Sequence, residues 1–365
     1  MPASMLRRWF LSVLLLLAGV IGPGRPSPAE AATPERSSGG YVLTITSGRS
    51  LANLESIDSF GVTEQGTLAA RLLLRYLSDG DRQALQAARD VWSGIISREN
   101  FGGDYTALQW FADMALSPPD QQRQQLQDPR VASYYAFFAA NDFALLREYL
   151  GRKYALAPYE DLETEKGRIR LAFLEDSILF NNPRREEWER TSLILNSLQI
   201  RPGETVADIG SGPGYYSFLF AERVGSTGRV YAIDTVKAHL DYINSVIRRT
   251  GLTTITTINN HNESIGLPVG TKVDTAFMCS LYHILYLVYR ESAREQLLAT
   301  IRNSLKPGGR LVIVDNSLVE DSQLPYHGPY IAKELVIAQL EHHGFRLESS
   351  RQFIPQRYVL TFRLQ

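Results

Sequence analysis

The sequence predicts an α/β fold in which a doubly wound sheet with a terminal antiparallel strand is preceded by a small all-helical domain. Before about residue 182, apolar residues recur at steps of three and four, a spacing typical of packed amphipathic helices. From about residue 201, short β-rich runs alternate with helical stretches, and this rhythm indicates parallel strands joined by crossover helices. A glycine-rich turn directly follows the first of these strands.

Each expected element has its own signal in the chain. In the first half, helices are expected over residues 68–76, 84–96, 105–116 and 131–150. In the second half, strands are expected over residues 205–209, 230–234, 253–258, 273–278 and 310–315, with helices over 236–249 and 291–305. A final strand pair over 345–353 and 357–364, separated near Pro355, forms the antiparallel element. We therefore place a helical domain at residues 41–182 and a second domain at 183–365.

Composition and charge exclude several classes of protein. With 44% hydrophobic and 21% charged residues, the chain has enough apolar surface to form packed cores, so it is globular. The 38 basic and 39 acidic residues leave a net charge of -1, which gives no broad positive field for a nucleic-acid partner. A single cysteine, Cys279, rules out an intrachain disulfide and a thiolate metal cluster. No metal site is predicted, because the adjacent His342 and His343 point to different sides of a helix.

The N-terminus is typical of an export signal. Arg7 and Arg8 precede an apolar run over 9–22 that is too short for a mature membrane span, and Ala29-Glu30-Ala31 offers a cleavage pattern. We expect a signal peptide at 1–32, a linker at 33–40, and a periplasmic protein without a stable transmembrane span, exported by the secretory or the twin-arginine route. Two alternatives remain. The segment is an uncleaved membrane anchor, or the start codon is mis-called and the protein is cytoplasmic.

The most informative segment spans residues 206–217 and contains Asp208, Gly210, Ser211, Gly212 and Gly214 between a strand and a helix. Glycines permit a tight turn and a close approach of ligand to backbone, and the helix N-terminus offers free N–H groups. The dinucleotide fingerprint has another glycine spacing, which disfavours an NAD-dependent oxidoreductase. The carboxylate of Asp208 would repel a diphosphate but suits an ammonium group, so we expect a zwitterionic, phosphate-free nucleoside as ligand.

This segment resembles the first motif of class I S-adenosylmethionine-dependent methyltransferases. The similarity extends from about Phe180 to the C-terminus, and the run Trp188-Glu189-Arg190, followed by Pro202-Gly203, is similar to a bacterial small-molecule-type branch. Residues 305–310 resemble the family's turn into its fifth strand. The resemblance implies a Rossmann-like domain, S-adenosyl-L-methionine as cofactor, and methyl transfer to a small-molecule acceptor.

Further cofactor contacts are expected at the ends of the next strands. Asp234 ends the second strand, where a carboxylate can accept two hydrogen bonds from a ribose diol; its other reading is a cap of the following helix. After the third strand, the family commonly places an aspartate against the adenine amine. In this chain Asn262 or Glu263 could accept that hydrogen bond, and the sequence does not choose between them.

The loop after the fourth strand is expected to border the methyl group and the acceptor, because ligands of open α/β sheets lie beyond the carboxyl ends of the strands. Cys279 lies at this strand end. Tyr282 and His283 follow as candidates for holding or deprotonating the acceptor, since histidine titrates near neutrality; the alternative for His283 is a packing role. Pro329-Tyr330 stands where the branch often carries a His-Arg pair, so the acceptor can differ.

Two matters stay open from the sequence. The alternative function is an exported protein that keeps the fold and the nucleoside but has lost catalysis, because the methyl donor is made in the cytoplasm. The helical domain either covers the substrate side or binds a protein partner. Its aromatic side chains are expected to pack in its own core rather than around a ligand.

Overall fold

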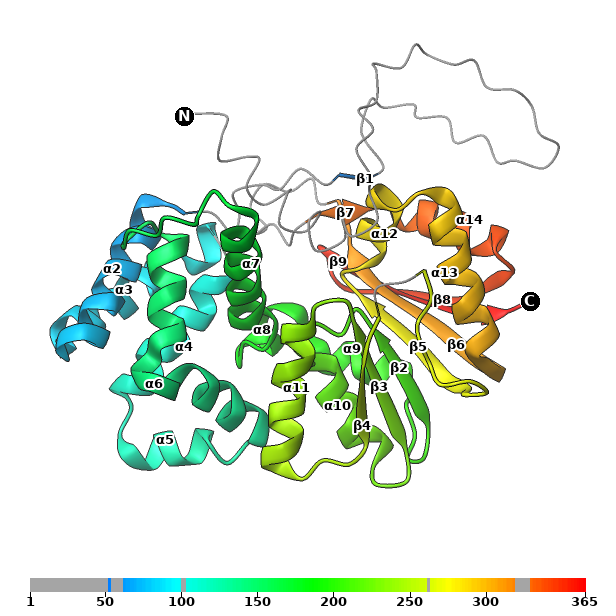
Figure 1. Cartoon of the computed structure of the whole chain (residues 1–365), viewed down its shortest axis with the longest axis horizontal. Coiled ribbons are helices and arrows are strands. Elements are labelled where there is room, and N and C mark those ends of the chain that lie inside the picture. Colours follow the sequence, from blue (N-terminus) through cyan, green and yellow to red (C-terminus); the bar gives the residue numbers. More distant parts are fainter. Residues whose placement is uncertain (1–51, 54–61, 100–102, 261–262, 319–328) are drawn as a thin grey trace, which may run out of the picture.

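The computed structural model describes residues 52–53, 62–99, 103–260, 263–318 and 329–365. Figure 1 shows the helices of the first half gathered on one side, with the sheet and its helices on the other. The expected signal peptide and linker, residues 1–40, lie outside the described residues. Among the residues that are described, no helix has both the length and the hydrophobicity that a membrane span requires.

The first half of the described chain is a bundle of helices. They are α2 (Glu64–Asp79), α3 (Arg82–Glu99), α4 (Asp104–Leu116), α5 (Pro119–Gln125), α6 (Pro129–Lys153) and α7 (Glu165–Phe180). A threonine caps α7, because Thr164 Oγ1 accepts a hydrogen bond from the backbone N–H of Gly167. The expected aromatic core is confirmed: Trp110, Phe111, Tyr134 and Phe138 are buried against one another.

Two local features differ from the expected all-helical domain. Helix α6 is broken at residues 140–143, where Asn141, Asp142 and Phe143 have φ values of 52°, 57° and 58°. The apolar spacing continues on both sides of this break, which is why the sequence predicts one helix. In addition, β1 (Ala52–Asn53) pairs antiparallel with β7 (Tyr330–Ile331), so this segment joins the sheet-forming half of the molecule rather than the bundle.

Two short helices, α8 (Arg185–Glu189) and α9 (Thr191–Leu198), connect the bundle to the sheet (Figure 1). Arg190 between them has a φ of 58°, and this left-handed residue turns the chain from one helix into the next. Ile194 and Leu198 of α9 are buried against the sheet. Helix α8 therefore lies between the helical bundle and the sheet, just before the first strand of the large sheet.

The second half forms a seven-stranded sheet with the order β4-β3-β2-β5-β6-β9-β8. The strands are β2 (Thr205–Ile209), β3 (Arg229–Asp234), β4 (Ile255–Asn259), β5 (Val273–Cys279), β6 (Leu305–Asn316), β8 (Phe345–Ile354) and β9 (Arg357–Leu364). All neighbours are parallel except for β9, which runs antiparallel to both β6 and β8. The predicted doubly wound sheet with a terminal antiparallel element is confirmed.

Helices cover both faces of this sheet. One face packs against α9, α10 (Tyr215–Val224) and α11 (Lys237–Thr250), and the other packs against α12 (Tyr282–Val288), α13 (Glu291–Ser304) and α14 (Lys333–His342). The chain winds outward from β2 toward β3 and β4, and then returns to β5 on the other side of β2. The carboxyl ends of β2 and β5 thus form the switch point where such sheets bind ligands.

The entry into β6 differs from the predicted turn. The strand begins at Leu305, which pairs with Val273, whereas the next pairing joins Thr275 to Arg310. The four residues between them bulge out of the ladder, and Gly308 has a φ of 75° at this bulge. The glycines therefore shape an irregularity within the strand rather than a turn before it.

Candidate cofactor and acceptor site

The glycine-rich turn lies between β2 and α10, at the switch point of the sheet. Gly210, Gly212 and Gly214 have φ values of 72°, 52° and 88°, in the left-handed region that side chains disfavour. A Cβ atom on Gly210 would lie 2.7 Å from Leu281, and one on Gly214 would lie 2.7 Å from Ile243. Both positions therefore require glycine for space as well as for backbone conformation.

The middle of the turn is more open. A Cβ atom on Gly212 would meet only Phe180, at 3.5 Å, which is an ordinary contact distance. The neighbouring Ser211 is buried, and its backbone N–H donates a hydrogen bond to Ile233 O at 3.0 Å. The turn is thus fastened to β3 while the backbone at Gly212 can be approached by a ligand.

Asp208, near the end of β2, lies beneath this turn. Its side chain is only 2% exposed, and Oδ2 accepts a hydrogen bond of 2.5 Å from Ser217 Oγ on α10. Burial raises the pKa of Asp208 to about 7, and the negative charge of Asp234 contributes to this rise, while Ser217 and Arg185 oppose it. The two acids therefore lie close enough on adjacent strands to interact.

Asp234 ends β3 and contacts the turn directly. Its Oδ2 accepts a hydrogen bond of 2.7 Å from the backbone N–H of Gly212, and its Oδ1 accepts one of 2.7 Å from Val236 at the start of α11. Asp234 thus borders the glycine turn, as the ribose reading requires, but it is not the cap of α11. The N-cap of α11 is Val236, which has no side-chain cap hydrogen bond.

Cys279 lies on the other side of the switch point, at the end of β5. Its Sγ is 3.5 Å from Arg357 Nη1 and 3.9 Å from Glu189 Oε1. Burial raises the pKa of the Cys279 thiol to about 11, so it is uncharged at neutral pH and is a poor nucleophile. Cys279 can therefore border a ligand without reacting with it.

His283 forms a buried pair with Asp315, the penultimate residue of β6. His283 Nδ1 lies 2.7 Å from Asp315 Oδ1, and the backbone N–H of His283 donates to Asp315 Oδ2 at 3.0 Å. This pairing orients the ring and favours the tautomer with the proton on Nδ1, which leaves Nε2 as an acceptor. Among the described residues, no hydrogen-bond partner lies at Nε2. The arrangement suits a general base.

Tyr282 has a different environment from the one predicted. Its side chain is fully buried, and its hydroxyl donates a hydrogen bond of 3.1 Å to Gln339 Oε1 on α14. The ring packs in the core formed by α12, α13, α14 and the sheet. The first turn of α12 directs this side chain into the core, which favours a packing role over contact with the acceptor.

The two candidates for the adenine contact are only partly placed. Asn262 lies outside the described residues. Glu263 follows β4 and is half-buried. Burial raises the pKa of the Tyr289 phenol, and the negative charge of Glu263 adds to this rise. No described contact selects Glu263 as the adenine partner.

A buried charged cluster of Arg185, Glu189 and Arg357 was missed by sequence reasoning. Arg185 Nε and Nη2 donate to the Glu189 carboxylate at 2.6 and 2.9 Å, and Arg357 donates to the same carboxylate. The Arg185 guanidinium also lies 4.4 Å from the ring centre of Tyr215. Burial, followed by repulsion from Arg185, lowers the pKa of Arg357 to about 9. Two arginines thus share one carboxylate beside Cys279 at the end of β5.

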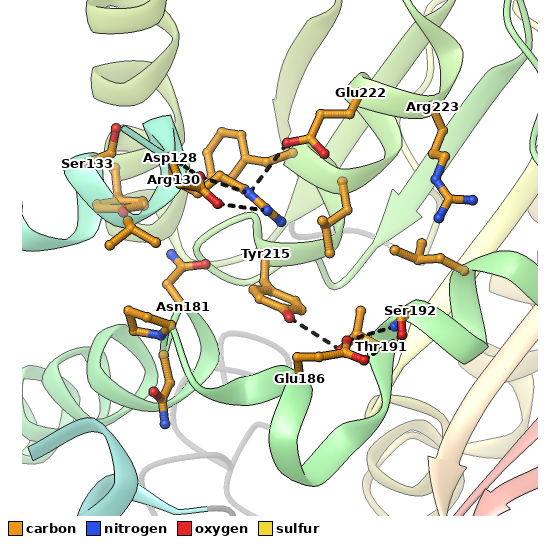
Figure 2. A pocket seen from close by; sticks show the side chains of 17 residues that line it. Asp128, Arg130, Ser133, Asn181, Glu186, Thr191, Ser192, Tyr215, Glu222 and Arg223 are labelled. Carbon is orange, nitrogen blue, oxygen red and sulfur yellow. Dashed lines mark hydrogen bonds and ion pairs between the residues drawn. The ribbon is translucent and has the colours of Figure 1, made fainter. Parts of the chain in front are cut away.

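A separate cavity of about 480 Å³ lies beside α10, where the helical bundle meets α9 (Figure 2). Arg130 and Ser133 of α6 line it from the bundle, and Thr191 and Tyr215 line it from the sheet half. Asn181 also lines it and donates a hydrogen bond of 2.9 Å to Pro213 O in the glycine turn. This cavity therefore adjoins the outer side of the turn and contains none of the predicted site residues.

Residues 200–345 match the family model described as "Methyltransferase domain". Residues 200–345, the methyltransferase domain of this match, make up less than half of the chain. This methyltransferase domain begins just before β2, includes the glycine turn and the β5 loop, and ends where β8 begins. Its two strand-end carboxylates and open glycine backbone fit S-adenosyl-L-methionine, because this cofactor combines an ammonium group and a ribose diol without any phosphate.

Curated relatives of this chain carry names that specify different methyl acceptors. A protein-L-isoaspartate O-methyltransferase of Aeropyrum pernix is 32% identical over 33% of this chain and 42% of that protein. A ubiquinone/menaquinone biosynthesis C-methyltransferase of Hydrogenovibrio crunogenus is 32% identical over 36% of this chain and 49% of that protein. The matches therefore span less than half the length of each of these two relatives.

Two solved structures are similar to this chain at low identity. An S-adenosylmethionine-dependent methyltransferase from Aquifex aeolicus is 23% identical, with a TM-score of 0.42, over 50% of this chain and 94% of that chain. The 1,6-didemethyltoxoflavin-N1-methyltransferase of Burkholderia thailandensis is 17% identical, with a TM-score of 0.39, over 68% and 92% of the two chains.

Proposed function

We propose that this chain transfers the methyl group of S-adenosyl-L-methionine to a small-molecule acceptor. The observation that carries the proposal is the contact of Asp234 with the glycine turn, because it brings the carboxylate that we assign to the ribose hydroxyls next to the backbone of Gly212. When bound, the cofactor supplies a methyl group on a positively charged sulfur. The protein then needs mainly to align the acceptor, and such positioning can contribute on the order of 7 to 11 kcal/mol.

The residues have distinct parts in this proposal. Gly212 offers its backbone to the cofactor, Asp234 accepts hydrogen bonds from the ribose hydroxyls, and Asp208 supports the ammonium side of the site. His283 takes a proton from the acceptor at Nε2, while Asp315 holds the opposite ring nitrogen. Asp315 is thus a positioning residue rather than a catalytic one.

The acceptor that best suits this site is one that loses a proton on methylation. The His283–Asp315 pair supports this choice, because a base is needed only when the acceptor atom carries a proton that must leave. The names of the two curated relatives specify methylation at oxygen and at carbon. An acidic hydroxyl or an activated carbon is therefore the acceptor chemistry we propose.

The decisive experiment is methyl transfer by the purified chain. Radiolabelled S-adenosyl-L-methionine is incubated with the protein and a small-molecule extract, and label is followed into organic products. Transfer by the wild type and loss of transfer in Asp234→Ala would support the proposal. Cofactor binding without transfer to any acceptor would favour the catalytically inactive alternative, and absence of binding would reject both.

We also propose that the chain is exported as a periplasmic protein. The support is the sequence itself, in which Arg7 and Arg8 precede the apolar run over 9–22. Mass spectrometry of the N-terminus of protein isolated from its native host tests this directly. We expect a chain that starts near Ala32, and a chain that keeps Met1 would contradict cleavage.

A further inference from the structure

His239 connects the helical bundle to the proposed cofactor site. This residue lies in the first turn of α11, and its ring is buried between one carboxylate from each half of the molecule. Nε2 is 3.2 Å from Asp176 Oδ2 on α7, and Nδ1 is 3.5 Å from Asp234 Oδ1 at the end of β3. Phe173 of α7 covers the ring, with 5.9 Å between ring centres.

The charge on His239 follows from these neighbours. Burial alone would lower the pKa of His239, but Asp176 and Asp234 together outweigh burial and raise it to about 10. Hydrogen bonding to the two carboxylates and their negative charge both favour the protonated ring. At neutral pH, His239 is therefore an imidazolium ion between two carboxylates.

We infer that Asp176 and His239 are positioning residues for Asp234, so that the helical bundle completes the cofactor site. The inference rests on the proposed function, because it concerns the carboxylate that would accept the ribose hydroxyls. It adds that a residue outside the methyltransferase domain takes part in cofactor binding. Asp176 belongs to α7, which precedes residues 200–345 in the chain.

The geometry around Asp234 explains why a cation is useful there. Two backbone N–H groups, from Gly212 and Val236, fix the plane of the carboxylate. Its negative charge also acts on the nearby Asp208, where it adds to the raised pKa. A cation at His239 offsets this repulsion beside a carboxylate that can accept hydrogen bonds from two hydroxyl groups.

Asp176 acts through His239. The titratable groups that influence the imidazole are Asp176 from α7 and Asp234 from β3. Replacement of Asp176 by a neutral residue removes one of the two charges that keep His239 protonated, so the pKa of His239 falls. Removal of Asp176 should therefore shift the pH at which cofactor binding weakens, even though Asp176 does not reach the site itself.

A calorimetric titration with S-adenosyl-L-homocysteine tests this inference on the full chain. We expect His239→Gln to bind about tenfold more weakly than wild type at pH 7.5, because the neutral amide cannot act as a counter-charge. In Asp176→Asn, the decline of affinity at alkaline pH should move to lower pH, and Asp176→Glu should restore the wild-type profile. Asp113→Asn, which removes an exposed carboxylate of the bundle paired with Arg89, is the matched control.

The outcomes separate this inference from the proposed function. Asp176 is 26% exposed, so Asp176→Asn should fold even if His239→Gln does not. An Asp176→Asn variant with the wild-type affinity and pH profile would overturn the inference, and loss of binding in Asp234→Ala alone would then leave the proposed function intact. Wild-type protein that does not bind the probe would reject both.

Discussion

Asp234 Oδ2 accepts a hydrogen bond of 2.7 Å from the backbone N–H of Gly212, and this contact joins the end of β3 to the glycine turn after β2. Parallel strands that end at the same edge of a sheet make such a meeting possible. The relationship matters because it brings a carboxylate, an open stretch of backbone and the N-terminus of α10 into one small region.

Gly210 and Gly80 form a matched pair for measuring the effect of crowding at the turn. Both have a φ of 72°, but a Cβ on Gly210 would lie 2.7 Å from Leu281, whereas nothing lies within 4 Å of one on Gly80. We expect Gly80→Ala to lower the free energy of unfolding by about 1 kcal/mol and Gly210→Ala by about 2 to 4 kcal/mol. Urea denaturation measures both, and equal losses would show that Leu281 does not restrict Gly210.

Asp208 should destabilise the protein as pH rises. Because the pKa of Asp208 is about 7 in the folded chain, well above the 3.8 of an unperturbed aspartate, the folded state holds the proton more tightly. Stability therefore falls between about pH 4 and 7. Asp208→Asn removes this effect and should gain on the order of 1 to 3 kcal/mol relative to wild type when pH is raised from 5 to 8. Urea denaturation at both pH values checks it, with Asp113→Asn as control. A difference that does not change with pH would contradict the prediction.

His283→Asn should separate catalysis from binding. The asparagine amide can still donate to Asp315, but no group remains to accept a proton at the position of Nε2. We expect kcat to fall by about 10² to 10⁴ with little change in KM or in cofactor affinity. Steady-state kinetics with the acceptor found by radiolabel transfer test this, and His343→Asn is the control. Unchanged kcat would assign His283 a packing role.

Tyr282→Phe should affect stability rather than activity. The substitution removes the hydrogen bond from the buried hydroxyl to Gln339 while it keeps the ring in the core. We expect the free energy of unfolding to fall by about 1 kcal/mol and kcat to stay near the wild-type value. A fall in kcat of tenfold or more, in a variant of nearly normal stability, would instead indicate that Tyr282 contacts the acceptor.

The sequence predicts the elements that depend on local patterns. The segment 205–209 is found as β2 without any change in its ends, because an apolar run and a following glycine turn define it on both sides. The proximity of Asp208 and Asp234 could also be expected, since both lie at the carboxyl ends of strands in the fold that the motif implies. Helix α6 shows the limit of this reasoning, because its break at Asn141 leaves the apolar spacing on either side intact.

The rest of the site depends on contacts between distant parts of the chain. Glu189 and Arg357 are 168 residues apart, and no local spacing indicates that they share a buried ion pair. The pairing of Asp176 with His239 likewise depends on how α7 packs beside α11. The sequence places the acidic Asp315 at the end of the fifth expected strand, but only the fold brings it to His283.

The most direct measurement is a calorimetric titration of the purified full chain with S-adenosyl-L-methionine, carried out in parallel on Asp234→Ala. The account predicts one cofactor bound per chain in the wild type and at least about tenfold weaker binding in the variant, with a melting temperature changed by only a few degrees. Equal affinity in the two proteins, or no binding to the wild type, would contradict it.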